Sequence, residues 1–296
     1  MPELAIVTCR DLPDWEVDDT PLLEELRRLG ADYRLVPWDD PGTDWSDFGA
    51  ALIRTTWDYA DRIEDFLAWS KMAAEQTRLF NGPEVLEWNL DKIYLRDLEQ
   101  RGIRITDSVF ADRGQPIDLR ALCEERSWKK AFLKPTVGAS ARETLPVEFD
   151  DDSLAKGQAH LDRLLREEGM IIQPFLSAVL DEGEFSIVFV DGKATHGVRK
   201  VPVPGDYRVQ DDYGASDMPW AYEAGDLEFA TRTLDACVDT LGIEASKLLY
   251  GRVDFLRADD GALRINEVEL VEPSMFFRHG PGAAEKLARA FADRAA

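Results

Sequence analysis

The chain has 296 residues, of which 45% are hydrophobic and 31% are charged, as is ordinary for a globular enzyme with room for two or three subdomains. Its 58 acidic residues outnumber 35 basic ones and give a formal net charge of -23, which argues against broad contact with nucleic acid or an anionic membrane. The chain opens without a basic segment and contains no apolar run of membrane-spanning length, so we expect a cytoplasmic protein.

The cysteines and histidines are scattered without metal-binding spacing. Cys9, Cys123 and Cys237 form no Cys-x-x-Cys pair, which indicates buried thiols in a reducing compartment and neither disulfides nor a zinc site. No Gly-x-Ser-x-Gly turn is present to support a Ser-His-Asp triad.

The N-terminal part predicts a small parallel α/β domain. Its expected strands cover 4–9, 33–36 and 51–54, and its expected helices cover 22–29 and 63–79. A further helix is expected over 91–101, where it stops at Gly102.

The rest of the chain mixes strands and helices and then returns to sheet. Strands are expected over 103–110, 131–134, 170–173, 185–190 and 194–198, with helices near 117–126, 152–168, 226–241 and 283–295.

Two apolar runs flank the turn Asp260-Gly261 and predict a β-hairpin. If residues 258–261 form its loop, residue 254 lies opposite residue 265. Strand alternation then places on one face the side chains of Asp254, Ile265, Glu267 and Glu269. Because carboxylates on one face repel one another, this hairpin predicts a site for divalent cations and polyphosphate. The alternative is a solvated acidic face.

Lys134 ends an apolar run and precedes a loop of small residues that includes Gly138 and Ser140. An ammonium group and mobile backbone amides together suit a phosphate, and Lys92 upstream adds a second charge. Downstream, residues 170–176 offer an apolar slot and the Gln173 amide, which suit a flat heterocycle such as adenine. The alternative is a core strand that ends in a turn.

Three basic residues follow the hairpin predicted over 185–198. Arg199, Lys200 and Arg208 lie within ten residues in a strongly acidic chain, which favours an anion site over ordinary surface salt bridges.

Two further segments are candidates for substrate contact. Thr56, Trp57 and Tyr59 follow a predicted strand, although Trp57 and Tyr59 can equally be core aromatics. Ser274 follows Pro273 close to the predicted metal site.

In the order of these segments the chain resembles the ATP-grasp superfamily of ATP-dependent carboxylate ligases, which includes glutathione synthetase and D-alanine-D-alanine ligase. The resemblance covers roughly residues 85 to 280. It implies an α/β and α+β architecture, the ATP-grasp fold, with a small parallel N-terminal domain over 1–85. Two α+β subdomains, over 86–175 and 176–296, would clasp ATP.

The resemblance also implies roles for the candidate residues. The ATP phosphates would contact Lys92, Lys134, Gly138 and Ser140; adenine would contact Gln173, Phe175 and Leu176; and the ribose would contact Glu184. Two magnesium ions, or manganese in their place, would be held by Asp254, Glu267 and Glu269. The chain departs from the family pattern where Glu269 replaces the usual Asn, and where the phosphate loop has one glycine.

A finer resemblance lies in four separated motifs, at residues 54–59, 87–92, 205–210 and 266–274. They are similar to the subgroup that contains the cyclo-ligase of cycloserine biosynthesis, which closes O-ureido-D-serine to a five-membered ring. This implies an acyl phosphate formed from ATP, with Arg199, Lys200 and Arg208 in catalysis and Thr56, Trp57, Tyr59 and Ser274 at the substrate.

Two other functions are compatible with the same machinery. An intermolecular amide or peptide ligase of the glutathione-synthetase kind would differ only in that a second molecule supplies the amine. A nucleotide-binding protein without ligase activity would be expected to lack the metal carboxylates or the basic stretch, and this chain has both. The expected partner is a small amino-acid-like molecule, and monomer and homodimer both stay open.

Overall fold

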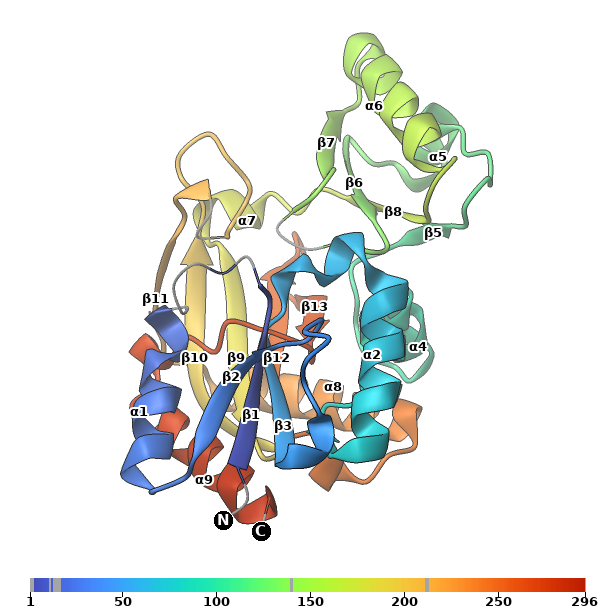
Figure 1. Ribbon diagram of the computed structural model, residues 1–296. Coiled ribbons are helices and arrows are strands. Elements are labelled where there is room, and N and C mark those ends of the chain that lie inside the picture. The colour runs from blue at the N-terminus through green and yellow to red at the C-terminus, as the bar shows by residue number, and fades with distance from the viewer. Residues whose placement is uncertain (1–2, 11, 13–16, 139–140, 211–212, 296) are drawn as a thin grey trace.

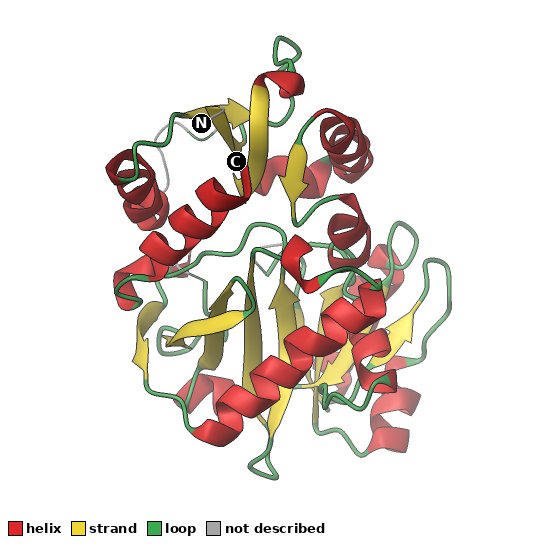
Figure 2. Cartoon of the chain, turned by 90° about the horizontal axis from the view of Figure 1, so that it is seen from below, coloured by secondary structure: helices red, strands yellow, loops and turns green. Residues whose placement is uncertain are grey.

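The structure, a computed structural model, describes residues 3–10, 12, 17–138, 141–210 and 213–295. Its strands form three sheets, one parallel and two antiparallel (Figure 1). Helices lie across the faces of these sheets (Figure 2). This is the combination of one parallel α/β unit and two α+β units that the resemblance implies.

The N-terminal sheet is parallel and has the strand order β2-β1-β3-β4. Its elements are β1 (Glu3–Thr8), α1 (Thr20–Arg28), β2 (Tyr33–Pro37), β3 (Phe48–Thr55), α2 (Ile63–Gln76) and β4 (Arg78–Phe80). The helix predicted over 63–79 ends at Gln76, because Thr77 is extended and its hydroxyl donates a hydrogen bond to the Phe48 carbonyl. The chain then continues as the edge strand β4, which was not predicted because its first residues were assigned to the helix over 63–79.

The central sheet is antiparallel, with the order β5-β8-β6-β7. Its elements are β5 (Val109–Ala111), α5 (Leu119–Arg126), β6 (Lys130–Pro135), β7 (Leu145–Glu148), α6 (Asp151–Leu164) and β8 (Met170–Pro174). The two helices bury Leu119 and Leu161 in one core with Leu133 of β6. This lobe stands out from the rest of the molecule in Figure 1.

The C-terminal sheet is antiparallel, with the order β11-β10-β9-β12-β13. Its elements are α7 (Ala178–Asp181), β9 (Glu184–Val190), β10 (Lys193–Val201), β11 (Ser216–Trp220), α8 (Ala224–Leu241), β12 (Tyr250–Arg257) and β13 (Leu263–Glu269). Phe229 and Leu234 of α8 share a core with Val253 and Phe255 of β12. The hairpin predicted across Asp191-Gly192 is formed by β9 and β10.

Three segments pack against a different structural unit from the one to which the expected domain boundaries assign them. Helices α3 (Pro83–Asn89) and α4 (Tyr94–Gln100) contact α8, and Leu95 and Leu98 join the core of the C-terminal sheet. Ile103 and Ile105 pack in the same core. The strand expected over 103–110 is therefore shorter and is formed only by β5, Val109–Ala111. Helix α9 (Ala283–Ala295) packs on α1 of the N-terminal domain.

The carboxylate hairpin forms from β12 and β13, but its register differs from the expected one. Asp254 lies opposite Glu267, and Phe255 lies opposite Ile265. Asn266 is therefore an extra residue in β13, a bulge that moves the pairing by one position. The predicted pairing of 254 with 265 is wrong, and Ile265 is buried in the core shared with α8. The carboxylates of Asp254, Glu267 and Glu269 all line one cavity.

The described residues bear on two further expectations. Cys9, Cys123 and Cys237 are free and buried, as predicted. Among the described helices, none combines the length and the apolar character needed to cross a membrane.

Candidate active site

A cavity of about 490 Å³ is lined by residues from all three sheet units. The N-terminal domain contributes Trp57 and Tyr59, which follow β3. The central lobe contributes Lys134 from β6, and the C-terminal sheet contributes Asp254 from β12. Segments far apart in the sequence thus meet around one space.

Most of the residues singled out from the sequence line this cavity. They are Trp57, Tyr59, Lys92, Lys134, Gly138, Gln173, Phe175, Leu176, Glu184, Lys200, Arg208, Asp254, Glu267, Glu269 and Ser274. Thr56 is buried outside the lining, where its hydroxyl has no hydrogen-bond partner among the described residues. Ser140 lies outside the described residues.

Arg199 does not reach the cavity, contrary to expectation. Alternation along β10 turns Lys200 into the cavity and Arg199 away from it. The Arg199 guanidinium instead donates hydrogen bonds to the backbone carbonyls of Asp181 and Glu182, at the C-terminal end of helix α7. The prediction treated three neighbouring bases as one cluster and ignored the strand period.

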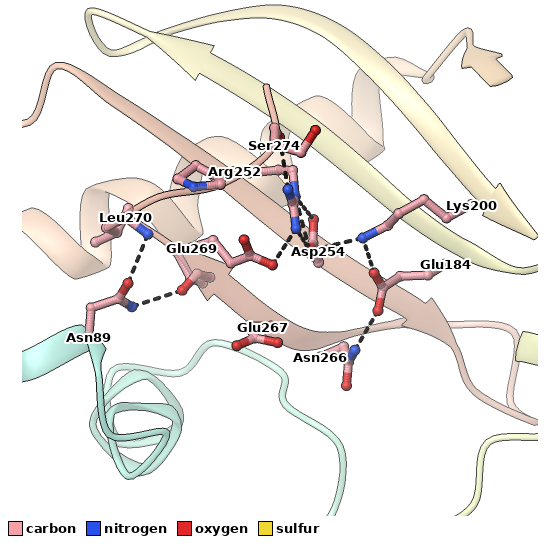
Figure 3. Close-up of polar contacts among 12 residues, drawn as sticks. Asn89, Glu184, Lys200, Arg252, Asp254, Asn266, Glu267, Glu269, Leu270 and Ser274 are labelled. Carbon is pink, nitrogen blue, oxygen red and sulfur yellow. Dashed lines mark hydrogen bonds and ion pairs between the residues drawn. The ribbon is translucent and has the colours of Figure 1, made fainter. Parts of the chain in front are cut away.

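A network of buried ion pairs lies on the side of the cavity formed by β9, β10, β12 and β13, which we call the floor (Figure 3). Arg252 donates from Nε to Asp254 Oδ1 at 2.9 Å, and it also contacts Glu269. Lys200 Nζ lies 3.1 Å from Asp254 Oδ2 and contacts Glu184 as well. Burial opposes ionisation of Asp254, but Arg252 and Lys200 outweigh it and hold the pKa of this carboxyl well below its usual range. Asp254 is therefore ionised at neutral pH.

Asn89 and Asn266 fix the strand that carries the carboxylates (Figure 3). The Asn89 side chain donates to the Val268 carbonyl and accepts from the Leu270 N–H, each at 2.8 Å. Asn266, the bulged residue, donates to Glu184. These bonds hold β13 against α3 and β9, and so set where Glu267 and Glu269 point.

Two lysines, Lys92 and Lys134, line the cavity. Lys92 Nζ lies 2.9 Å from Glu267 Oε1 and donates to the Gly138 carbonyl at 2.7 Å. Lys134 is buried, and its Nζ reaches the Asn266 backbone and side-chain oxygens at 3.4 Å without an ion pair among the described residues. Burial lowers the pKa of Lys134 to about 8; the Glu267 charge opposes this shift, and the Lys92 charge adds to it. A buried ammonium without a carboxylate partner suits an anionic ligand.

We expect Lys134→Met to stabilise the unliganded protein and to weaken nucleotide binding. The pKa of Lys134 in the folded protein lies below its ordinary value of 10.5. Between about pH 8 and 10.5 the lysine is therefore protonated in the unfolded chain but mostly neutral in the folded one. As the pH rises through this range, the unfolding free energy of the wild type increases. The variant should therefore be more stable at pH 7, by on the order of 1–3 kcal/mol, and the difference should shrink towards pH 10.5. Denaturant unfolding at pH 7 and 10, with calorimetry of ATP binding, measures both effects. A variant that is less stable at pH 7 and binds ATP normally would make Lys134 a structural residue.

Two further carboxyl groups that line the cavity, those of Glu269 and Glu272, are difficult to ionise. Burial raises the pKa of Glu269 to about 8, although Arg252 lies beside it. Burial also raises the pKa of Glu272 to about 7, although the nearby Tyr59 hydroxyl opposes this shift. Neighbouring carboxylates oppose ionisation of both groups, so additional positive charge on this face would stabilise them.

The donor set suits magnesium in its chemistry. As the side chains stand, no three carboxylates, histidines or cysteines in the described ranges converge closely enough to hold a metal ion. Asp254, Glu267 and Glu269 each contact a cationic side chain instead. Oxygen ligands with an excess of negative charge are what hard divalent cations prefer.

Aromatic rings surround the end of the cavity next to Gln173. Phe132, Phe175 and Tyr207 contact one another edge to face, with ring centroids 5.4–6.2 Å apart, and all three line the cavity. The Gln173 amide donates from Nε2 to Ser108 Oγ at 2.7 Å. An apolar, aromatic-walled slot of this kind suits a flat heterocycle.

Several cavity residues were missed from the sequence. Phe132 and Arg252 lie two positions before Lys134 and Asp254 on the same strand faces, so strand alternation could have identified both. Tyr207 and Glu272 lie in loops, where no period applies. Arg208, which was predicted, is held by the Asp206 carboxylate and stacks 3.7 Å from the Tyr213 ring centroid.

Comparison with known proteins places the chain in a family. Residues 4–81 match the family model of the N-terminal domain of D-cycloserine synthetase DcsG. The cycloserine biosynthesis protein DcsG of Streptomyces lavendulae is 31% identical over 301 residues, which cover 98% of each chain. The crystal structure of D-cycloserine synthetase DcsG matches with a TM-score of 0.88 at 29% identity, over 99% of this chain and 100% of that one.

A more distant ligase shares the fold. D-alanine–D-alanine ligase from Bacillus anthracis, solved with ATP, matches with a TM-score of 0.67 at 13% identity, over 100% of this chain and 97% of that one. The fold predicted from the sequence is thereby confirmed, and the chain belongs to the DcsG family of ATP-grasp ligases.

Proposed function

We propose that this ligase uses ATP to activate the carboxylate of O-ureido-D-serine and closes the same molecule to the five-membered ring of D-cycloserine. The observation that carries the proposal is the single cavity in which the buried lysines, the carboxylate floor and the Trp57–Tyr59 segment meet. The relationship to DcsG, named for cycloserine biosynthesis, supports this choice of substrate.

The chain's own residues support the first step by charge. A substrate carboxylate oxygen attacks the γ-phosphorus, ADP leaves, and an acyl phosphate forms. Lys92, Lys134, Lys200 and Arg208 line the cavity and offset the charge on the transferring phosphoryl group, which is the main demand of such a step. Magnesium, held by Asp254, Glu267 and Glu269 as two ions, would supply further positive charge at the phosphates.

In the second step the ureido nitrogen that is bonded to oxygen attacks the acyl carbon and loses its proton, and inorganic phosphate leaves. The ring nitrogen then still carries the carbamoyl group, which water removes as carbamate; the carbamate decomposes to carbon dioxide and ammonia, and D-cycloserine remains. Phe132, Phe175 and Tyr207 would enclose adenine at one end of the cavity, and Trp57, Tyr59 and Ser274 would face the substrate at the other. Such enclosure keeps water from the acyl phosphate. Once the substrate is held in a compact cavity, intramolecular attack has a high effective molarity, so no site for a separate amine molecule is required.

The test is ADP release with O-ureido-D-serine as the sole added carboxylate, with the products identified by mass spectrometry. We expect ADP and D-cycloserine in equal amounts without any added amine. Amines and amino acids are then added one by one. If ADP appears only when one of them is present, the enzyme is an intermolecular ligase of the glutathione-synthetase kind, and the ring-closure proposal fails.

A further inference from the structure

Glu272 lies in the loop after β13 and lines the same cavity as Trp57, Tyr59 and Ser274. Arg252 Nη1 donates to the Ser274 carbonyl at 2.8 Å and so fixes this loop next to the buried Arg252–Asp254 pair (Figure 3). The Tyr59 hydroxyl lies close to the Glu272 carboxyl and favours its ionised form, which opposes the rise in its pKa. A loop of the C-terminal sheet unit and a turn of the N-terminal domain thus meet at one carboxylate.

Charge distinguishes Glu272 from the other acidic residues of the cavity. Glu184 and Asp254 pair with Lys200, Glu267 pairs with Lys92, and Glu269 pairs with Arg252. In the part of the chain that the structure describes, no ion pair includes Glu272. The neighbouring Tyr59 hydroxyl supplies a dipole but no charge.

The nearest guanidinium groups form their ion pairs with other carboxylates, and Arg54 Nη1 has no hydrogen-bond partner among the described residues. The fields of Arg252 and Arg54 reach Glu272, but Arg252 is bound to Asp254 and Glu269. Arg54 is bound to Asp19 through two hydrogen bonds of 2.7 and 2.9 Å. A partly buried carboxylate without a matched cation is costly, and a ligand with a single positive charge would remove that cost.

The surroundings of Glu272 suit a primary ammonium group. An ammonium carries one charge and three N–H donors, and Glu272 offers a carboxylate acceptor. Trp57 lines the same cavity and is 41% exposed, and an aromatic face attracts an ammonium. Lys134, which suits an anion, belongs to the phosphate part of the cavity.

From this geometry we propose that Glu272, positioned by Tyr59, binds the α-ammonium group of the amino-acid substrate and makes the enzyme select α-amino carboxylates. The inference rests on the proposed function for the identity of the substrate. It assigns to Glu272 a role in specificity that is separate from the phosphate and metal chemistry.

The experiment compares O-ureido-D-serine with its deamino analogue, 3-(ureidooxy)propionate, by ADP release. For each enzyme the ratio of kcat/KM between the two carboxylates is measured. The Glu272→Gln change keeps the shape and removes the charge, and should reduce this ratio on the order of 100-fold, as expected for the loss of one partner of a buried charge pair. Tyr59→Phe should reduce the ratio less, because it removes only the neighbouring hydroxyl.

Two controls separate specificity from a general loss of structure. Glu285→Gln removes an exposed carboxylate on α9, paired with Arg28 and Arg289, and should leave the ratio unchanged. ATP affinity by calorimetry should show that the cavity of Glu272→Gln still forms. If Glu272→Gln slows both carboxylates equally, or shifts the magnesium dependence and not the ratio, the proposal is overturned.

Failure of the proposed function would look different. In that case the wild-type enzyme releases no ADP with O-ureido-D-serine, and the comparison moves to any carboxylate that does support ADP release and to its deamino analogue. The inference fails if the deamino compound is the better substrate or if Glu272→Gln leaves that ratio unchanged.

Discussion

Replacing Glu267 with glutamine is expected to lower kcat about 10²–10³-fold while leaving the unliganded fold nearly as stable as before. The Glu267 side chain is 30% exposed and has one ion pair, to Lys92, so its charge contributes little to folding. The same charge faces the proposed phosphate site, where a neutral amide binds magnesium less well. Turnover at graded magnesium concentrations, together with thermal unfolding, measures both effects.

The matched control is Glu148→Gln on β7. Glu148 also pairs with a lysine, Lys130, at 2.7 Å, but it lies outside the cavity and its side chain is 56% exposed. The control should keep full activity. Full activity of Glu267→Gln at limiting magnesium would contradict the metal assignment.

Replacing Arg252 with methionine is expected to cost about 3–5 kcal/mol of unfolding free energy and to abolish turnover. The guanidinium is buried, where it neutralises Asp254 and Glu269 and holds the Ser274 carbonyl. Its removal leaves two carboxylates facing each other, and burial already raises the pKa of Glu269 to about 8. The loss should therefore be larger at high pH, where Glu269 must ionise, than at pH 6.

Magnesium should partly restore the stability of the Arg252→Met variant, because an ion that binds only the folded carboxylates favours the folded state. Denaturant unfolding with and without magnesium measures this effect. Calcium, which also binds oxygen ligands, is a second divalent cation for comparison. Potassium at equal ionic strength controls for general screening of the charges. If Arg252→Met unfolds like the wild type at both pH values, the buried pair does not stabilise the cavity floor in the way described.

The sequence predicted the three sheet units and most cavity residues because the informative patterns are local. Lys134 ends a buried strand, and Asp254 and Glu267 lie on strands with clear alternation. The order of such segments along the chain was sufficient to indicate the family.

The failures come from features that depend on tertiary structure. The bulge at Asn266 changes the hairpin register, and a two-residue period cannot reveal it. Packing of Ile103 and Ile105 in a neighbouring core shortened a predicted strand. The contact between Tyr59 and Glu272 joins two loops that are far apart in the sequence, and only the folded chain shows it.

The central claim, an acyl phosphate that closes on its own molecule, is tested most directly by labelling the substrate carboxylate of O-ureido-D-serine with oxygen-18. Carboxylate attack on the γ-phosphorus followed by ring closure transfers one labelled oxygen to inorganic phosphate and leaves the other in the ring carbonyl of D-cycloserine. We expect one oxygen-18 atom in each phosphate released and one in each ring product, at equal amounts of ADP and D-cycloserine. Unlabelled phosphate, or labelled phosphate without the ring product, would contradict the account.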